Sequence, residues 1–215
     1  MQNTYSKSKA PKNYSKAEIS NRDFFAADLD RADFSNSTLI GCSFKASTLY
    51  NALFYKTQVI DCTFEGAHLS NARLYKAYIK DSAFDEALMD NVSLTSVEIA
   101  ASSFRTTDLT QSEWANCYLP ANDFSFAKLE ETLFEHSNLT SCIFSYANLK
   151  GMDQVLSDLS DINLKHATSI PIHIGRHVQM LRSMRQDADM LTLIENKYRD
   201  KHRGDSRAYD RSVNF

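Results

Sequence analysis

The sequence repeats every five residues. From Ile19 to Leu149, every fifth position is apolar, which makes 27 such positions without an exception; we call them anchors. The position two residues before each anchor is Ala, Ser, Thr, Cys or Val in 25 of 27 cases, and only Arg22 and Asn122 depart from this rule. A period of five matches neither the α-helix, at about 3.6 residues per turn, nor the β-strand, at about 2. The repeat therefore encodes a different regular object.

The two columns of inward positions predict a solenoid. Two inward residues separated by one outward residue form a short piece of strand, and the other two residues of each five must turn a corner. With only 5 Gly and 3 Pro, ordinary residues must make most corners. One unit cannot bury its apolar side chain alone, so units must stack. The anchors at 24, 44, 64, 84, 104, 124 and 144 are all Phe, whereas those at 34, 54, 74, 94, 114 and 134 vary, which predicts twenty-residue coils with four sides.

Five-residue segments such as "ADLDR", "ADFSN", "TDLTQ", "SNLTS" and "ANLKG" resemble the pentapeptide-repeat family, whose consensus is Ala-Asp/Asn-Leu-x-x. The resemblance extends over about three quarters of the chain. It implies an all-β solenoid, a right-handed four-sided β-helix with the large and small columns stacked inside. Residues 16–168 would form roughly 7–8 coils, a rod of about 35 Å at ~4.8 Å per coil.

The remaining segments differ in pattern from the repeat. We expect residues 1–15 to form a flexible basic tail and residues 204–215 a second flexible tail. Gln154 occupies an anchor position, which predicts a local bulge or loop near Gly151. From 169 to 203 the apolar spacing predicts one amphipathic α-helix or two, with a stripe formed by Val178, Leu181, Met184, Leu191, Ile194 and Tyr198. This segment caps the open end of the core, forms a homodimer, or does both.

Composition and motifs exclude several classes of function. No run of about 18 apolar residues could span a membrane, and the start of the chain has no apolar stretch to act as a signal peptide, so we expect a cytoplasmic protein. Because nucleophile motifs, phosphate-binding loops and dinucleotide fingerprints are missing, we expect neither an enzyme nor a cofactor. The four cysteines fall in the small column, which indicates reduced core residues. His173 and His177 lack an obvious third metal ligand and are interpreted as surface or cap residues.

Charge is unevenly distributed along the chain. Residues 1–15 carry a net charge of +3, residues 16–170 carry 12 basic and 21 acidic residues for a net charge of −9, and residues 171–215 carry +3. An acidic body argues against direct binding of nucleic acid by the repeat.

Some outward positions are large and apolar. One side of the predicted coil presents Leu53, Tyr55 and Tyr75, with Tyr75 directly above Tyr55. The adjacent side presents Ile40, Ile60, Tyr78 and Tyr118, and Tyr50 lies near the corner that leads into this region. Aromatic residues stacked on a β surface stabilise the wall, but a cluster that spans neighbouring coils is also typical of a protein contact.

Three functions remain open. The first is a non-catalytic scaffold that binds a protein partner through its outer walls. The second follows from the resemblance: some family members mimic DNA and modulate DNA gyrase or topoisomerase IV, although Lys45, Lys56, Arg73, Lys76, Lys80 and Arg105 interrupt the acidity here and no long loop separates the coils. The third is a secreted bacterial effector or an assembly scaffold.

Overall fold

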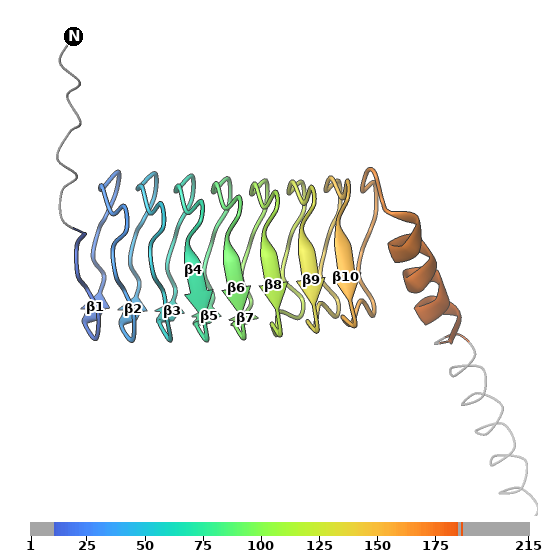
Figure 1. Cartoon of the computed structure of the whole chain (residues 1–215), viewed down its shortest axis with the longest axis horizontal. Helices are drawn as coiled ribbons and strands as arrows, with labels where there is room; N and C mark the ends of the chain where they lie inside the picture. The colour runs from blue at the N-terminus through green and yellow to red at the C-terminus, as the bar shows by residue number, and fades with distance from the viewer. Residues whose placement is uncertain (1–10, 185, 187–215) are drawn as a thin grey trace, which may run out of the picture.

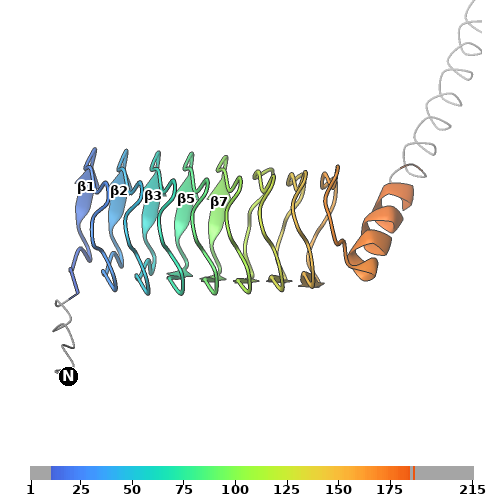
Figure 2. The same ribbon diagram turned by 90° about the horizontal axis from the view of Figure 1, so that it is seen from above.

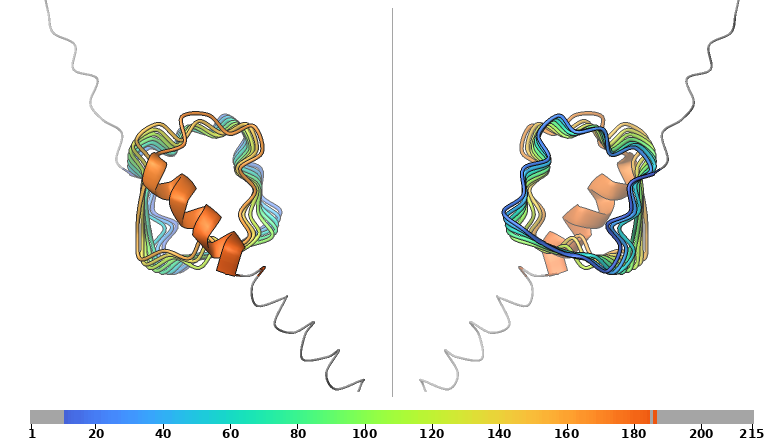
Figure 3. Two further views of the ribbon diagram at one scale, coloured as in Figure 1. Left: turned by 90° about the vertical axis from the view of Figure 1, so that its right-hand side faces the viewer. Right: turned by 90° about the vertical axis from the view of Figure 1, so that its left-hand side faces the viewer.

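The chain winds into the predicted all-β solenoid of about seven turns, followed by a single C-terminal helix (Figure 1). The structure, a computed structural model, describes residues 11–184 and residue 186. Viewed along its axis, each coil is a square with four sides, and the coils lie over one another (Figure 3). We number the sides in chain order by their first anchors: Ile19, Phe24, Leu29 and Phe34.

Parallel pairing at a spacing of twenty residues holds the coils together. For example, Leu39 pairs with Val59 and Val59 with Ile79. The first side forms a sheet (Figure 2) of β1 (Glu18–Ser20), β2 (Thr38–Ile40), β3 (Gln58–Ile60), β5 (Tyr78–Lys80) and β7 (Glu98–Ala100). The fourth side forms a sheet of β4 (Arg73–Tyr75), β6 (Ser93–Thr95), β8 (Glu113–Ala115), β9 (Leu133–Glu135) and β10 (Asp153–Val155). The second and third sides pair through isolated bridges with the same spacing.

The anchors form a continuous buried core. In the Phe column of the second side, neighbouring rings stack face to face with centroids 4.6 to 5.1 Å apart. The core begins earlier than the predicted boundary at residue 16, because Tyr14 takes an anchor position and stacks on Phe34 at 4.9 Å. Pairing accordingly starts at Asn13.

Left-handed backbone forms the corners. Every fifth residue from Lys16 to His166 has a positive φ, and only Gly41, Gly66 and Gly151 among them are glycine. At a typical corner the N–H of Ala27 donates to the carbonyl of Phe24 at 3.0 Å, and Ala26 between them has a φ of 50°. This is the geometry of a type II turn. Ordinary residues therefore make most corners, as the low glycine content predicts.

A polar ladder inside the small column explains the exception at Asn122. At the corner after the first side, the backbone N–H of Cys42 donates to the side chain of Cys62, one coil further on. The same bond recurs from Cys62 to Ser82, from Ser82 to Ser102 and from Ser102 to Asn122. The Asn122 Oδ1 accepts from the N–H of Ser102 at 2.9 Å, and its Nδ2 donates to the carbonyl of Ile99 at 3.0 Å. Both ends of the buried amide are satisfied, so an amide is accommodated where most repeats carry a small side chain.

All four cysteines are free and buried, which confirms their interpretation as reduced core residues. Burial raises the pKa of Cys62 to about 12 and that of Cys117 to about 11. Burial likewise raises the pKa of Cys142 to about 12. These thiols are thus protonated at neutral pH and are poor nucleophiles.

The bulge predicted near Gly151 is wrong. Strand β10 keeps the regular spacing, with Gln154 paired to Phe134. Gly151 takes the left-handed conformation that every corner residue takes, with a φ of 69°. Gln154 is only half-buried, and its Oε1 accepts from the N–H of Ser157 at 3.1 Å. The last full coil tolerates a polar anchor because that anchor keeps contact with water and makes its own hydrogen bond.

A helix at residues 172–184 lies across the C-terminal end of the solenoid (Figure 3). Ile174 and Val178 are buried against the core and Leu181 is partly buried. Met184 instead faces outward, 60% exposed. Of the predicted stripe, Val178 and Leu181 therefore pack on the core and Met184 does not. The other predicted residues, Leu191, Ile194 and Tyr198, lie outside the described residues. The homodimer stays a prediction. Within the described part of the chain, no helical segment has the length and hydrophobicity needed to span a membrane.

Candidate functional site

Ten outward residues of two adjacent coils form one surface around the corner between the fourth and first sides. We call this surface the corner patch; it consists of Leu53, Tyr55, Lys56, Gln58 and Ile60 on one coil and Arg73, Tyr75, Lys76, Tyr78 and Lys80 on the next. Their positions follow from the repeat, because the anchors between them point inward. Parallel pairing then sets Arg73 over Leu53, Tyr78 over Gln58 and Lys80 over Ile60.

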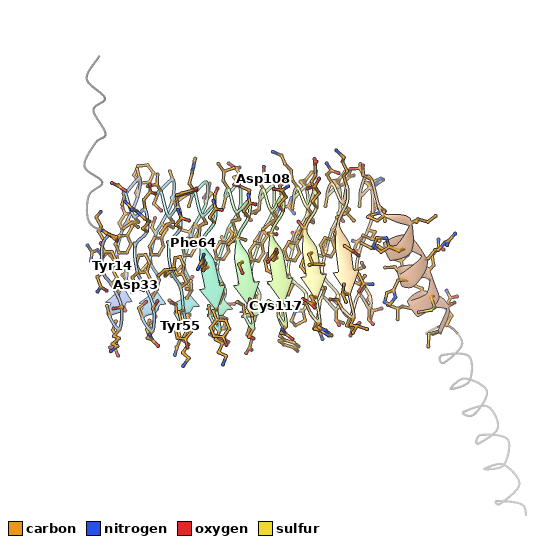
Figure 4. The ribbon with its side chains drawn as sticks, viewed as in Figure 1. Tyr14, Asp33, Tyr55, Phe64, Asp108 and Cys117 are labelled. Atoms are coloured by element: carbon orange, nitrogen blue, oxygen red, sulfur yellow. The ribbon has the colours of Figure 1, made fainter. Side chains whose placement is uncertain are left out.

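A tyrosine ladder lies at the centre of the corner patch. The rings of Tyr55 and Tyr75 stack with centroids 5.3 Å apart and planes 15° from parallel. Figure 4 shows the side chain of Tyr55 on the outside of the rod. The Nζ of Lys56 lies 5.2 Å from the Tyr55 ring centroid, and the Nζ of Lys76 lies 5.2 Å from that of Tyr75. Stacking and cation–π contacts restrict these side chains, so the patch is ordered while each tyrosine remains about two-fifths exposed.

The corner patch is positively charged on an acidic rod. It contains four basic residues and no acidic one. Lys80 pairs with Asp81 at 3.6 Å, whereas Lys56, Arg73 and Lys76 make no ion pair with any described residue. Elsewhere on the walls, carboxylates pair with Lys45, Arg105, Lys128 and Lys150. The corner patch differs from those places because three cations without an ion pair lie together on two adjacent coils.

The structure brings together most, but not all, of the residues predicted for the binding surface. Leu53, Tyr55, Ile60, Tyr75 and Tyr78 belong to the corner patch, and Ile40 extends it by pairing with Ile60 one coil earlier.

Two predicted residues lie apart from the corner patch. Tyr50 stands on the third side, across a corner from Leu53, where its N–H bonds to Asp30 at 3.3 Å. Tyr118 lies two coils beyond Tyr78, and Glu98 lies between them. Tyr50 is therefore on a different side of the coil from the corner patch, and Tyr118 is separated from it by the coil that carries Glu98.

Sequence reasoning missed a second aromatic ladder at the corner between the second and third sides. Phe126 stacks on Tyr146 at 4.9 Å, and Tyr146 stacks on His166 at 4.7 Å. The guanidinium of Arg105 lies 5.5 Å from the Phe126 ring centroid. The spacing of twenty residues between these aromatic residues was the available signal. This ladder differs from the corner patch because Arg105 is paired with Asp123.

A shallow groove of about 620 Å³ follows the corner between the first and second sides. Its lining includes the buried residues Cys42, Cys62 and Ser82 together with Asp61 and Asp81. Because burial raises the pKa of the Cys62 thiol to about 12, this thiol is not a reactive thiolate at neutral pH. Among residues 11–184 and 186, no cluster of His, Cys, Asp and Glu has the arrangement of a metal site.

Comparison with protein families identifies the repeat. Models of pentapeptide repeats match residues 27–66 and 123–153, and a model of the pentapeptide repeat region matches residues 57–122. Together they span 27–153, more than half of the chain. The chain belongs to the pentapeptide-repeat family. These models describe a structural repeat, and no enzyme family was detected.

Solved structures with the same fold share little sequence with this chain. HetL, a pentapeptide repeat protein involved in heterocyst differentiation regulation in the cyanobacterium Nostoc sp. strain PCC 7120, is 19% identical over 73% of this chain and 88% of its own, with a TM-score of 0.41. Full-length QnrB1, a plasmid-mediated fluoroquinolone resistance protein, is 16% identical over 80% of this chain and 94% of its own, with a TM-score of 0.36. Curated proteins gave no match.

Proposed function

We propose that this chain is a non-catalytic scaffold that binds a protein partner through the corner patch. The observation that carries the proposal is a contiguous, ordered and partly exposed set of tyrosines, aliphatic residues and unpaired cations on one corner of the rod. Tyrosine and arginine are enriched among the residues that dominate protein interfaces.

The solenoid supports this role mechanically. Each coil is hydrogen-bonded to the next on all four sides, and the tyrosines of the patch are already stacked before any partner arrives. A surface that is ordered in advance loses little conformational entropy on binding. The core below the patch, which includes Phe54 and Val59, is fully buried, so outward substitutions leave it intact.

The test removes one aromatic ladder and spares the other. In Tyr55→Ala/Tyr75→Ala, we expect the capture of native partners in a quantitative affinity experiment to fall at least tenfold, the effect of losing one or two dominant interface residues at ~1–2 kcal/mol or more. The matched control, Phe126→Ala/Tyr146→Ala, removes the other stacked pair, and alanine already occupies that corner column at Ala26 and Ala46. Equal capture by both variants and the wild type would reject the proposal.

A second candidate function is modulation of DNA gyrase or topoisomerase IV through mimicry of DNA. The net charge of −9 over residues 16–170 favours it, because an acidic rod resembles duplex DNA in charge. The cations of the corner patch oppose it, since they interrupt the negative surface on one wall. A gyrase supercoiling assay with and without a fluoroquinolone decides: no effect at micromolar protein eliminates this candidate.

A further inference from the structure

We infer that the partner presents to the corner patch a short extended segment in which carboxylate side chains alternate with apolar ones. This inference rests on the proposed function, because it specifies the chemistry of the partner that the same surface binds.

Unpaired charge points to an acidic partner. Lys56, Arg73 and Lys76 lie on the rim of the tyrosine ladder within two adjacent coils, and none of the three has a carboxylate partner among the described residues. A partner that covers the tyrosines must remove water from these cations as well. Burying an unpaired charge is costly, so a stable complex needs carboxylates opposite them. The planar guanidinium of Arg73 adds a preference for carboxylate over a neutral acceptor.

The apolar residues of the patch make a second demand. Leu53 and Ile40 are about two-fifths exposed, and Ile60 and Tyr78 are partly exposed. These residues flank the cations on both sides of the corner. A protein segment that carries Leu, Ile or Phe beside Asp or Glu satisfies both demands, whereas a nucleic acid supplies phosphates without aliphatic groups.

The surroundings of the patch limit the length of the acidic segment. Asp33 lies one coil before Leu53, and Glu98 lies one coil beyond Tyr78. Asp61 and Asp81 follow Ile60 and Lys80 on the next corner. These carboxylates limit the positive region to two coils, which is about 10 Å along the rod at ~4.8 Å per coil. A long polyanion would extend over acidic wall on either side, so a short segment is favoured over a nucleic acid.

The test compares three peptides that differ only in charge. Each has about five residues, which extend over ~17 Å, and alternates Glu, Gln or Lys with Leu or Phe so that three charged positions can face the three cations. A fluorescein label reports binding by anisotropy. We expect the Glu peptide to bind the wild-type protein roughly tenfold more tightly than the Gln peptide at low salt, since surface ion pairs contribute modestly and add over three cations. We expect the Lys peptide not to bind, and added salt to weaken the Glu peptide selectively.

Two protein variants locate the effect. Lys56→Gln/Arg73→Gln/Lys76→Gln removes the three unpaired cations and keeps both tyrosines, and we expect it to abolish the preference for Glu over Gln. The control, Lys45→Gln/Arg105→Gln/Lys128→Gln, removes the same charge from cations that are already paired, and we expect it to retain that preference.

Several results would overturn the inference. They are equal affinity for the Glu and Gln peptides, an unchanged preference in the patch variant, and no peptide binding up to about 1 mM. Tighter binding of an oligothymidylate of about ten nucleotides to the same three cations would assign the patch to single-stranded nucleic acid instead. Loss of partner capture in Tyr55→Ala/Tyr75→Ala but not in the patch charge variant would keep the proposed function and reject only the acidic segment.

Discussion

The buried amide of Asn122 provides a direct test of how the coils are held together. In Asn122→Ala, the N–H of Ser102 and the carbonyl of Ile99 lose their side-chain partners inside the solenoid. An unsatisfied buried polar group costs about 1–3 kcal/mol, so we expect this variant to lose ~2–4 kcal/mol of the free energy of unfolding.

Asn122→Ser is the matched control because it changes the side-chain volume almost as much but supplies a hydroxyl that can both donate and accept a hydrogen bond. Ser137 shows what such a hydroxyl does at the equivalent place in the small column, on the corner after the fourth side: its Oγ accepts from the N–H of Cys117 and donates to the carbonyl of Trp114, both at 3.0 Å. These two partners lie in the same relation to Ser137 as Ser102 and Ile99 do to Asn122. We therefore expect Asn122→Ser to lose less than about 1 kcal/mol.

Urea unfolding followed by circular dichroism measures the stability of both variants. The dependence of the unfolding free energy on urea concentration is compared as well, because a change in this slope would mean that the unfolded state or the two-state behaviour has changed. Hydrogen exchange of the Ser102 amide adds a local readout, and we expect it to accelerate only in Asn122→Ala. If the two variants lose equal stability, or if alanine costs less than about 0.5 kcal/mol, the polar ladder does not stabilise the solenoid and our reasoning is wrong.

Three further predictions concern the core and the walls. Phe64→Ala removes a buried ring stacked on Phe44 and Phe84 and should cost ~3–5 kcal/mol in urea unfolding, whereas Phe64→Leu should cost less than about 2; equal losses would contradict the stacked column. All four thiols should resist Ellman's reagent at mildly alkaline pH in buffer and react in denaturant, because all four are buried in the core; rapid labelling of the folded chain would refute this. Hydrogen bonds from Ser160 lower the pKa of Asp158 from its ordinary value of 3.8. The ionised Asp158 therefore contributes its full stabilisation above pH 3.8, and this stabilisation is lost as the pH falls through the lower pKa of the folded state. Thermal melts should show a smaller acid-induced loss of stability in Asp158→Asn than in the wild type.

The fold could be predicted from the sequence because the repeat is redundant. The same position of each five-residue unit points inward throughout the chain, so a single polar anchor such as Gln154 does not change the assignment of sides. In the structure, pairing at a spacing of twenty residues sets each anchor over the anchor of the previous coil, as the repeat predicts. The bulge near Gly151 was predicted wrongly because a polar anchor and a glycine suggest irregularity when considered alone. In the structure, the glycine occupies a regular corner, and the glutamine is near the end of the core.

The binding surface was harder to predict because it depends on which outward residues meet across corners and coils. Tyr50 and Tyr118 share the chemistry of the patch, but a corner and the carboxylate of Glu98 separate them from it. The importance of Lys56 and Arg73 depends on what they lack, an ion pair, and side-chain pairing is not visible in a linear sequence. The ladder from Phe126 to His166 was missed because its residues occupy corner positions, which the pattern of anchors does not describe.

The twenty-residue spacing makes the length of this rod adjustable only in whole steps. Deleting residues 81–100 would join Lys80 to Ala101, keep every column continuous and shorten the rod by ~4.8 Å. Deleting five residues would instead move every later column to a neighbouring side, and deleting one would turn the core outward. The architecture thus tolerates the gain or loss of whole coils. The number of coils between the corner patch and the C-terminal helix would set the distance between them in steps of ~4.8 Å.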